Sequence, residues 1–246
     1  MNIIRIKTLH STNVYLAELA SQETLEEGTT LVAENQTAGK GQRNKSWEAE
    51  PGKNITCSIL LYPEFLPLSH FFLLSEVISL GIRDTLWKYT DGISIKWPND
   101  IYYRDQKICG ILIENELSSS AYSRSIVGIG MNINQDEFRS DAPNPVSLRQ
   151  VIGRTFDLDM LLMEVWNNCF FWYEELRQGN TMMIEEAYFT SLYRNKGFHS
   201  YKDKSGGFQA RIERVGSNGL LYLQTKEGVS RQYTFKELEF LRGSEV

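Results

Sequence analysis

The segment from residue 96 to residue 114, KWPNDIYYRDQKICGILIE, restricts the fold more than any other part of the chain. It contains two strand-like runs separated by the polar turn Arg104–Gln106. Pro98 interrupts the ladder before them because proline has no backbone N–H to donate. Asn99 and Asp100 follow, and their side chains can hold a turn by bonding to the backbone. The segment therefore predicts adjacent strands with a polar turn at one edge.

Lys107 opens the returning strand and is the most informative residue of this segment. The two-residue period of a strand puts it on the same face as Cys109 and Ile111. If that is the inner face, a buried ammonium is costly unless it meets an anion. The alternative is a lysine at the strand edge, with a buried stem and an ammonium that reaches solvent. The residues alone leave both interpretations open.

Strand-like and helix-like runs fill most of the remaining chain, which predicts an α+β fold. After about residue 197 the pattern changes to short strands with Gly turns, as in a small β-barrel, so we expect domains 1–194 and 195–246. The predicted strands of the first domain are Ile3–Leu9, Thr29–Glu34, Ile55–Tyr62, Ile93–Trp97, Ile101–Tyr103, Lys107–Glu116 and Ser123–Asn134, and its helices are Val14–Ser21, Leu68–Tyr89, Leu158–Gly179 and Met182–Tyr193.

The composition limits the class of protein. The 246 residues carry a formal charge of −5, which does not favour a nucleic-acid-binding protein. Cys57, Cys109 and Cys169 lie far apart in apolar runs, which predicts reduced, buried thiols in a cytoplasmic protein. No signal-peptide core and no membrane-spanning run is visible in the sequence. We therefore expect neither nucleic-acid nor membrane binding.

Residues 36–53, QTAGKGQRNKSWEAEPGK, form a predicted loop that concentrates positive charge. Its glycines allow the backbone to come close to a ligand, and backbone N–H groups with nearby cations are what phosphates require. The spacing is not that of a P-loop. On composition alone a solvated surface loop is an equally good interpretation.

Two shorter segments carry weaker signals. Residues 127–134, VGIGMNIN, contain G-x-G at the end of a strand, but a third glycine and a following helix are missing, so a dinucleotide fingerprint is excluded. Gly128 and Gly130 instead make room for a flat ligand or a close strand. Residues 10–13, HSTN, are typical of an ordinary helix N-cap.

Taken in order, these segments resemble the biotin–protein ligase family, whose pattern is S-T-N, then Q-x-x-G-R-G-R-x-x-x-x-W, then K-W-P-N-D with K-x-x-G-I-L-x-E, then G-I-G-x-N-x-N. The resemblance covers roughly residues 1–190. It implies a fold like the class II aminoacyl-tRNA synthetases, with a mixed, mostly antiparallel sheet packed with helices and a C-terminal SH3-like barrel. It also implies a monofunctional enzyme without an N-terminal DNA-binding domain, and therefore no repressor function.

The resemblance implies that the enzyme activates biotin with ATP and Mg²⁺ as biotinyl-AMP and transfers biotin to a lysine of a biotin carboxyl carrier protein. No dedicated metal ligands are implied, since Mg²⁺ arrives with ATP on the Asp100 side. The catalytic residues implied are Lys107, Lys40 and Asp100; the biotin-binding residues are Ser11, Thr12, Asn13, Gln36, Gly39, Lys40, Gly41, Gln42, Lys107 and Gly110; the residues on the nucleotide side are Arg43, Lys45, Trp47, Lys96, Asn99, Asp100 and Asn132.

The chain departs from the family pattern in the loop, where G-R-G-R is replaced by G-K-G-Q. Lys40 keeps a positive charge but loses the bidentate fork of arginine, and Gln42 is neutral. Retention of the adenylate by this loop is therefore not implied. Lipoate ligases and octanoyl transferases, which share the fold, and a non-catalytic biotin sensor are the competing interpretations. The sequence leaves a homodimer open, formed through an exposed strand such as 123–134.

Overall fold

The computed structural model describes residues 2–41, 46–118, 121–139 and 144–241. A seven-stranded sheet dominates it, with the strand order β1-β2-β3-β7-β6-β5-β4. Only β1 and β2 run parallel, and every other neighbouring pair is antiparallel. The bounds are β1 Ile3–Leu9, β2 Thr30–Gln36, β3 Ile55–Leu61, β4 Ile93–Lys96, β5 Asp100–Tyr103, β6 Gln106–Ser118 and β7 Ala121–Met131.

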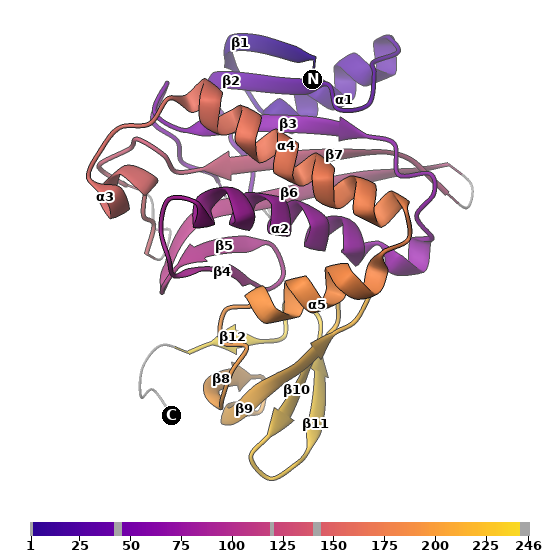
Figure 1. The fold of residues 1–246 in the computed structure, drawn as a ribbon, viewed down its shortest axis with the longest axis vertical. Coiled ribbons are helices and arrows are strands. Elements are labelled where there is room, and N and C mark those ends of the chain that lie inside the picture. Colours follow the sequence, from indigo (N-terminus) through magenta and orange to yellow (C-terminus); the bar gives the residue numbers. More distant parts are fainter. Residues whose placement is uncertain (1, 42–45, 119–120, 140–143, 242–246) are drawn as a thin grey trace.

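Helices cover the two faces of this sheet unequally (Figure 1). On one face α2 (Phe72–Trp87) and α4 (Leu158–Arg177) pack together, and α5 (Thr181–Ser191) packs against α2 and α4. On the other face α1 (Thr12–Gln22) contacts β2, β3 and β7. A short 3-10 turn, η2 (Leu68–His70), precedes α2. β3, an interior strand of the sheet, is buried at every residue.

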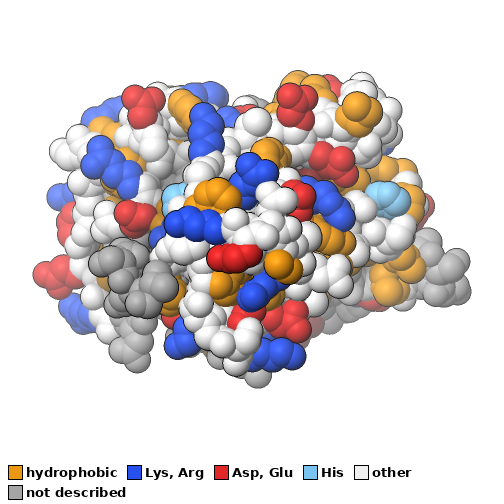
Figure 2. All heavy atoms as spheres, turned by 90° about the horizontal axis from the view of Figure 1, so that it is seen from below, with side chains coloured by type: hydrophobic (Ala, Val, Ile, Leu, Met, Phe, Trp, Pro, Cys, Tyr) orange, Lys and Arg blue, Asp and Glu red, His pale blue; other side chains and the backbone are white. Residues whose placement is uncertain are grey.

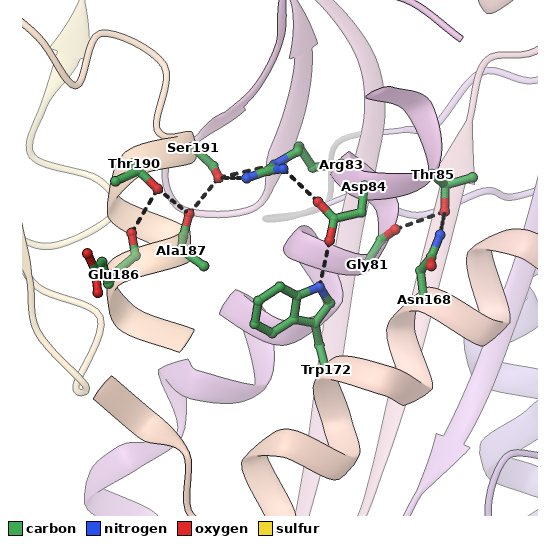
Figure 3. A network of polar contacts seen from close by, with 10 residues as sticks. All are labelled: Gly81, Arg83, Asp84, Thr85, Asn168, Trp172, Glu186, Ala187, Thr190 and Ser191. Atoms are coloured by element: carbon green, nitrogen blue, oxygen red, sulfur yellow. Dashed lines mark hydrogen bonds and ion pairs between the residues drawn. The ribbon is translucent and has the colours of Figure 1, made fainter. Parts of the chain in front are cut away.

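A chain of polar contacts joins the three helices of the first face (Figure 3). Arg83 of α2 donates to the hydroxyl of Ser191 on α5 and to the neighbouring carboxylate of Asp84. Asp84 in turn accepts a hydrogen bond of 2.8 Å from the indole of Trp172 on α4. These contacts satisfy polar groups that are largely removed from water, so they hold the helices in one arrangement.

The short helix α3 (Leu148–Ile152) was not predicted from the sequence. Its N-terminus is a capping box, in which the Ser147 hydroxyl accepts from the Gln150 N–H and the Gln150 side chain accepts from the Ser147 N–H. Gly153, at a φ of +83°, ends it. A helix of five residues is too short to produce an apolar periodicity, which explains the omission.

The C-terminal residues form a second, five-stranded antiparallel sheet with the order β11-β10-β9-β8-β12. Its strands are β8 His199–Asp203, β9 Gly206–Val215, β10 Leu221–Thr225, β11 Ser230–Tyr233 and β12 Glu239–Phe240. Among the described residues no pairing joins β11 to β12, so this sheet is open and the SH3-like barrel stays a prediction. Figure 2 views the molecule from this end and shows acidic and basic side chains interspersed.

The second sheet packs directly on the helices of the first. The Phe72 ring contacts Tyr188 of α5 at a centroid distance of 5.8 Å and Phe235 at 5.9 Å. Gly219 has a φ of +78°, and a Cβ there would lie 2.9 Å from Phe72 Cδ2, so only glycine fits this close approach. Buried residues of both sheets belong to one hydrophobic cluster. Burial of one such phenylalanine stabilises by roughly 1.5–3 kcal/mol.

No helix among residues 2–41, 46–118, 121–139 and 144–241 has both the length and the apolar content needed to cross a bilayer.

Candidate active site

A glycine row crosses the open face of the large sheet and forms the floor of the site. We define it as the register partners Thr56, Gly130, Gly110 and Asp100 on β3, β7, β6 and β5. The indole of Trp47 lies on this row, since a Cβ on Gly110 would lie 2.9 Å from Trp47 Cζ3 and a Cβ on Gly130 would lie 2.5 Å from Trp47 Nε1. The two glycines therefore provide a flat floor for a planar group.

Lys107 and Asp100 stand at the end of the glycine row. Lys107 Nζ lies 2.7 Å from Asp100 Oδ1, and the two side chains are only 27% and 24% exposed. The ammonium also lies 5.4 Å from the Trp47 ring centroid, within the range of a cation–π contact. The backbone of Lys107 is fixed as well, because its N–H donates to Asn144 O and its carbonyl accepts from Val146 N–H. The cation is therefore held in place.

The predicted face of Lys107 was wrong. The register shifts between Ile101 and Tyr102 of β5, so that Tyr102 pairs with Lys107 while Ile101 pairs with Cys109. This bulge leaves Ile108 unpaired and moves Lys107 to the opposite face from Cys109. Lys107 thus shares the face of Asp100 and the glycine row instead of pointing into the core.

Hydrogen bonds hold the turn after β4 against the rest of the site. The Trp97–Pro98 peptide bond is cis, and the Asn99 amide donates to the carbonyl of Ile111, whose own N–H donates to Asn99 O. Lys96 donates to the Tyr102 hydroxyl at 2.9 Å and lies over the rings of Tyr102 and Phe240.

The N-terminus of α1 closes the opposite end of the site. Ser11, Thr12 and Asn13 are all buried. Gln36 at the end of β2 accepts hydrogen bonds from the Thr12 N–H at 2.7 Å and from the Thr12 hydroxyl at 3.1 Å. The side chain of Ser11, the N-cap residue, makes no capping hydrogen bond. The Thr12 N–H at the start of α1, which has no partner within the helix, is thus satisfied by Gln36 of β2. The Ser11 side chain is not needed as a cap and lines the cavity.

These elements surround one cavity of about 1170 Å³. Among its lining residues, two buried polar atoms have no hydrogen-bond partner among the described residues: Trp47 Nε1 and Asn132 Oδ1. A donor and an acceptor in this state are candidates to bind a ligand, because leaving them unpaired is costly. The sequence-predicted residues that line the cavity are Ser11, Thr12, Asn13, Gln36, Lys40, Gly41, Trp47, Lys96, Asn99, Asp100, Lys107, Gly110 and Asn132.

Gly39 is the one other predicted residue that the structure describes, and it does not line the cavity. The Gly39 carbonyl accepts a hydrogen bond of 2.9 Å from the Trp47 N–H and so helps to hold Trp47 in place. Gln42, Arg43 and Lys45 lie outside the described residues. The described part of the chain contains no group of three His, Cys, Asp or Glu side chains suited to a metal ion.

The C-terminal sheet contributes residues that sequence reasoning missed. Phe235, Leu238, Glu239, Phe240 and Leu241 all line the cavity. Their segment was assigned to a separate small domain, and no motif in it marks contact with a ligand. Only the three-dimensional packing of the two sheets brings it to the site.

The three described cysteines are free and buried. Burial raises the pKa of the Cys109 thiol well above its usual value, although nearby Lys107 opposes this, and burial raises the pKa of Cys57 to about 12. Both thiols are therefore protonated near neutral pH and are poor nucleophiles.

Comparison with known proteins agrees with this geometry. Residues 5–132 match the model of the biotin/lipoate A/B protein ligase family. The chain is 30% identical over 246 residues to the bifunctional ligase/repressor BirA of Bacillus subtilis, covering 95% of this chain and 72% of that one. It is 30% identical over 144 residues to the biotin–[acetyl-CoA-carboxylase] ligase of Mycobacterium tuberculosis, covering 56% of this chain and 52% of that one.

Among solved structures, the biotin protein ligase of Aquifex aeolicus in complex with biotin and ATP superposes with a TM-score of 0.79 at 25% identity. The match covers 98% of this chain and 99% of that one. The cavity, the ordered motifs and these similarities lead to one conclusion: the chain belongs to the biotin/lipoate A/B protein ligase family.

Proposed function

We propose that this chain is an ATP-dependent biotin–protein ligase, which makes biotinyl-AMP and transfers biotin to a lysine of a biotin carboxyl carrier protein. The observation that carries the proposal is the Lys107–Asp100 pair at 2.7 Å, at the end of a glycine floor and inside the same cavity as Thr12 and Gln36. A held cation beside a flat, partly apolar floor suits a ligand with an uncharged ring system and an anionic end.

In the first step a carboxylate oxygen of biotin attacks the α-phosphorus of ATP. An O–P bond forms, the bond to the bridging oxygen breaks, and pyrophosphate leaves. Both reactants are anions, so the main tasks are alignment and stabilisation of negative charge. Lys107 offers its ammonium to both, and Asp100 orients it. Lys40, which is exposed at the cavity wall, adds a second cation.

In the second step the amine of the carrier lysine attacks the carbonyl carbon of the mixed anhydride. The new C–N bond forms, AMP leaves with the electrons of the broken C–O bond, and the ammonium proton passes to solvent. Neither step needs a covalent enzyme intermediate, and the protonated, buried thiols offer none. On the nucleotide side we propose Asn132, whose Oδ1 lacks a partner in the described chain, Asn99 and Trp47.

Mg²⁺ fits this site only as an ion carried by ATP. Such an ion is usually held by one or two carboxylates together with substrate phosphates and water, and Asp100 can supply one carboxylate. When bound, it would neutralise phosphate charge. Lys107 and Lys40 remain the cations that the protein itself supplies.

The proposal extends to the organisation of the protein. We propose a catalytic domain 1–194, and an SH3-like domain 195–246 whose Phe240 stands beside Lys96. We also propose a cytoplasmic location, since the described cysteines are free and buried. The proposal covers ligation alone and assigns no repressor activity, and a homodimer stays open.

The test is the intact mass of a biotin carboxyl carrier domain after incubation with the protein, ATP, Mg²⁺ and either biotin or lipoate. We expect the mass increase of one biotinyl group on the carrier with biotin and no change with lipoate. A lipoyl mass increase would favour the lipoate branch of the family. Biotin binding without ATP–pyrophosphate exchange would favour a sensor.

A further inference from the structure

Asn13 has almost no hydrogen-bonding capacity left for a ligand. Its Nδ2 donates to Leu112 O at 3.2 Å and to Glu114 Oε2 at 2.7 Å, and its Oδ1 accepts from Ser58 Oγ at 2.6 Å. A side-chain amide has two N–H donors and one oxygen acceptor, so both donors are used within the protein. The residue is only 3% exposed. Its amide therefore binds the sheet.

The sheet contains a notch that fits this amide. Ser58, Gly128 and Leu112 are consecutive register partners on β3, β7 and β6. A Cβ on Gly128 would lie 3.0 Å from Asn13 Cγ and closer still to Oδ1, so a larger residue would displace Asn13. One side chain of α1 thus spans three strands, one step along the sheet from the glycine row.

The hydrogen bonds of Asn13 lie at the end of α1 that is next to the cavity. One turn later along α1, Leu16 is fully buried in an apolar cluster with Leu31 and Leu60. Apolar packing is non-directional and tolerates small rotations of a helix. The Asn13 hydrogen bonds are directional, and they act at the cavity end, next to Ser11 and Thr12.

We propose that Asn13 is a positioning residue: through Ser58 and Glu114 it fixes the first turn of α1, so that Ser11 and Thr12 face biotin. This inference rests on the proposed function and refines it, since it moves Asn13 from ligand contact to the support of its neighbours. The contact should affect biotin binding more than ATP binding, because it lies at the α1 end of the cavity.

The most selective perturbation is Ser58→Ala, which removes one hydroxyl and its hydrogen bond to Asn13. Ser125→Ala is a matched control, because Ser125 is also a fully buried serine of the same sheet and donates to an asparagine side chain, Asn115, at 2.7 Å. Glu114→Ala and Glu114→Gln form a second pair, since glutamine keeps an oxygen that accepts from Asn13.

The first readout is hydrogen exchange in the ligand-free protein. Ser58→Ala should accelerate exchange of the Thr12 amide, which donates to Gln36, about 3- to 10-fold, the factor expected for one lost hydrogen bond. Ser125→Ala should not. Equal exchange in wild type and Ser58→Ala would overturn the inference, whatever the protein catalyses.

The second readout is steady-state biotin-dependent ATP–pyrophosphate exchange. Ser58→Ala and Glu114→Ala should raise the KM for biotin about 3- to 10-fold, with little change in kcat or in the KM for ATP, while Glu114→Gln stays near wild type. A loss of kcat with an unchanged biotin KM would overturn the inference. If the wild-type protein shows no ATP–pyrophosphate exchange, the proposed function is refuted. The hydrogen exchange of the Thr12 amide would still decide the role of Asn13.

Discussion

Glu76 of α2 should make the free energy of unfolding fall as the pH rises, and Glu76→Gln should remove this dependence. The side chain is 1% exposed, and its Oε2 has no hydrogen-bond partner among the described residues. Burial, and then the negative charge of Glu185 on α5, raise the pKa of this carboxyl well above its usual value. Burial and the nearby Glu76 carboxyl in turn raise the pKa of the buried Tyr188 hydroxyl. The carboxyl is therefore protonated in the folded state well above the pH at which an exposed glutamate ionises.

The sign and size of the effect follow from proton linkage. In the unfolded chain Glu76 ionises near about pH 4.3, whereas in the folded chain it keeps its proton at higher pH. The favourable contribution of this extra proton is fully present below the unfolded pKa and is lost as the pH rises towards the folded pKa. In that window the free energy of unfolding falls by about 1.4 kcal/mol per pH unit on account of this one group. Glutamine does not titrate, so the variant lacks this slope.

The assay is equilibrium unfolding in urea at a series of pH values from about 5 to about 7. The difference in unfolding free energy between Glu76→Gln and wild type should grow in favour of the variant by up to about 1.4 kcal/mol for each pH unit. Any fixed cost of burying the amide shifts the curve without changing its slope. Glu76 and Glu186 both line a second cavity, of about 710 Å³, but Glu186 is exposed, so Glu186→Gln is the control and should leave the slope unchanged. Parallel curves for wild type and Glu76→Gln would refute the reasoning.

Two further predictions concern the site, and a third concerns the packing of the two sheets. Lys107→Ala should lower the rate of biotin-dependent pyrophosphate exchange by roughly 10²-fold or more, as expected for the loss of a charge-stabilising donor, and near wild-type exchange would count against its assignment. Gly130→Ala should displace the Trp47 indole, because the added Cβ would lie 2.5 Å from Nε1. Since Trp47 is assigned to the nucleotide side, calorimetry should show weakened ATP binding, and unchanged affinity would argue against that assignment. Trp97→Phe removes the 3.1 Å hydrogen bond from the indole to Gly219 O, which joins the two sheets. Urea unfolding should show that the free energy of unfolding falls by about 0.5–1.5 kcal/mol. An unchanged free energy of unfolding would show that this hydrogen bond does not stabilise the contact between the sheets.

Local patterns were sufficient for the elements with strong periodicity. The run predicted as the strand Ile55–Tyr62 is β3, Ile55–Leu61, and the helix predicted at Leu158–Gly179 is α4, Leu158–Arg177. In α4 the buried residues recur with the helical period, whereas β3 is a short, mostly apolar run that is buried at every residue, so each leaves a direct signal in the sequence. The family resemblance, which came from four ordered motifs, is confirmed by the family match over residues 5–132.

Contacts between distant segments were not accessible in the same way. Phe235 and Phe240 gave no sign of lining a cavity with Lys96, because their local pattern is that of any exposed small sheet. The contact arises only when Phe72 and Gly219 pack the second sheet on α2. Sequence reasoning predicted a domain boundary near residue 195 from a change in pattern, but such a change says nothing about which surfaces pack together.

Lys107 shows how a correct residue can be reached through a wrong geometry. The sequence singled it out because a period-two count placed it on the face of Cys109, and a charge on that face would need an anion if the face were the inner one. In the structure a bulge at Ile108 cancels that count, and Lys107 stands beside Asp100 on the open face. A strand period is reliable only between bulges, and bulges concentrate beside active sites, where they redirect a side chain. The β-bulge that made the period-two prediction wrong is thus the feature that brings Lys107 to the site.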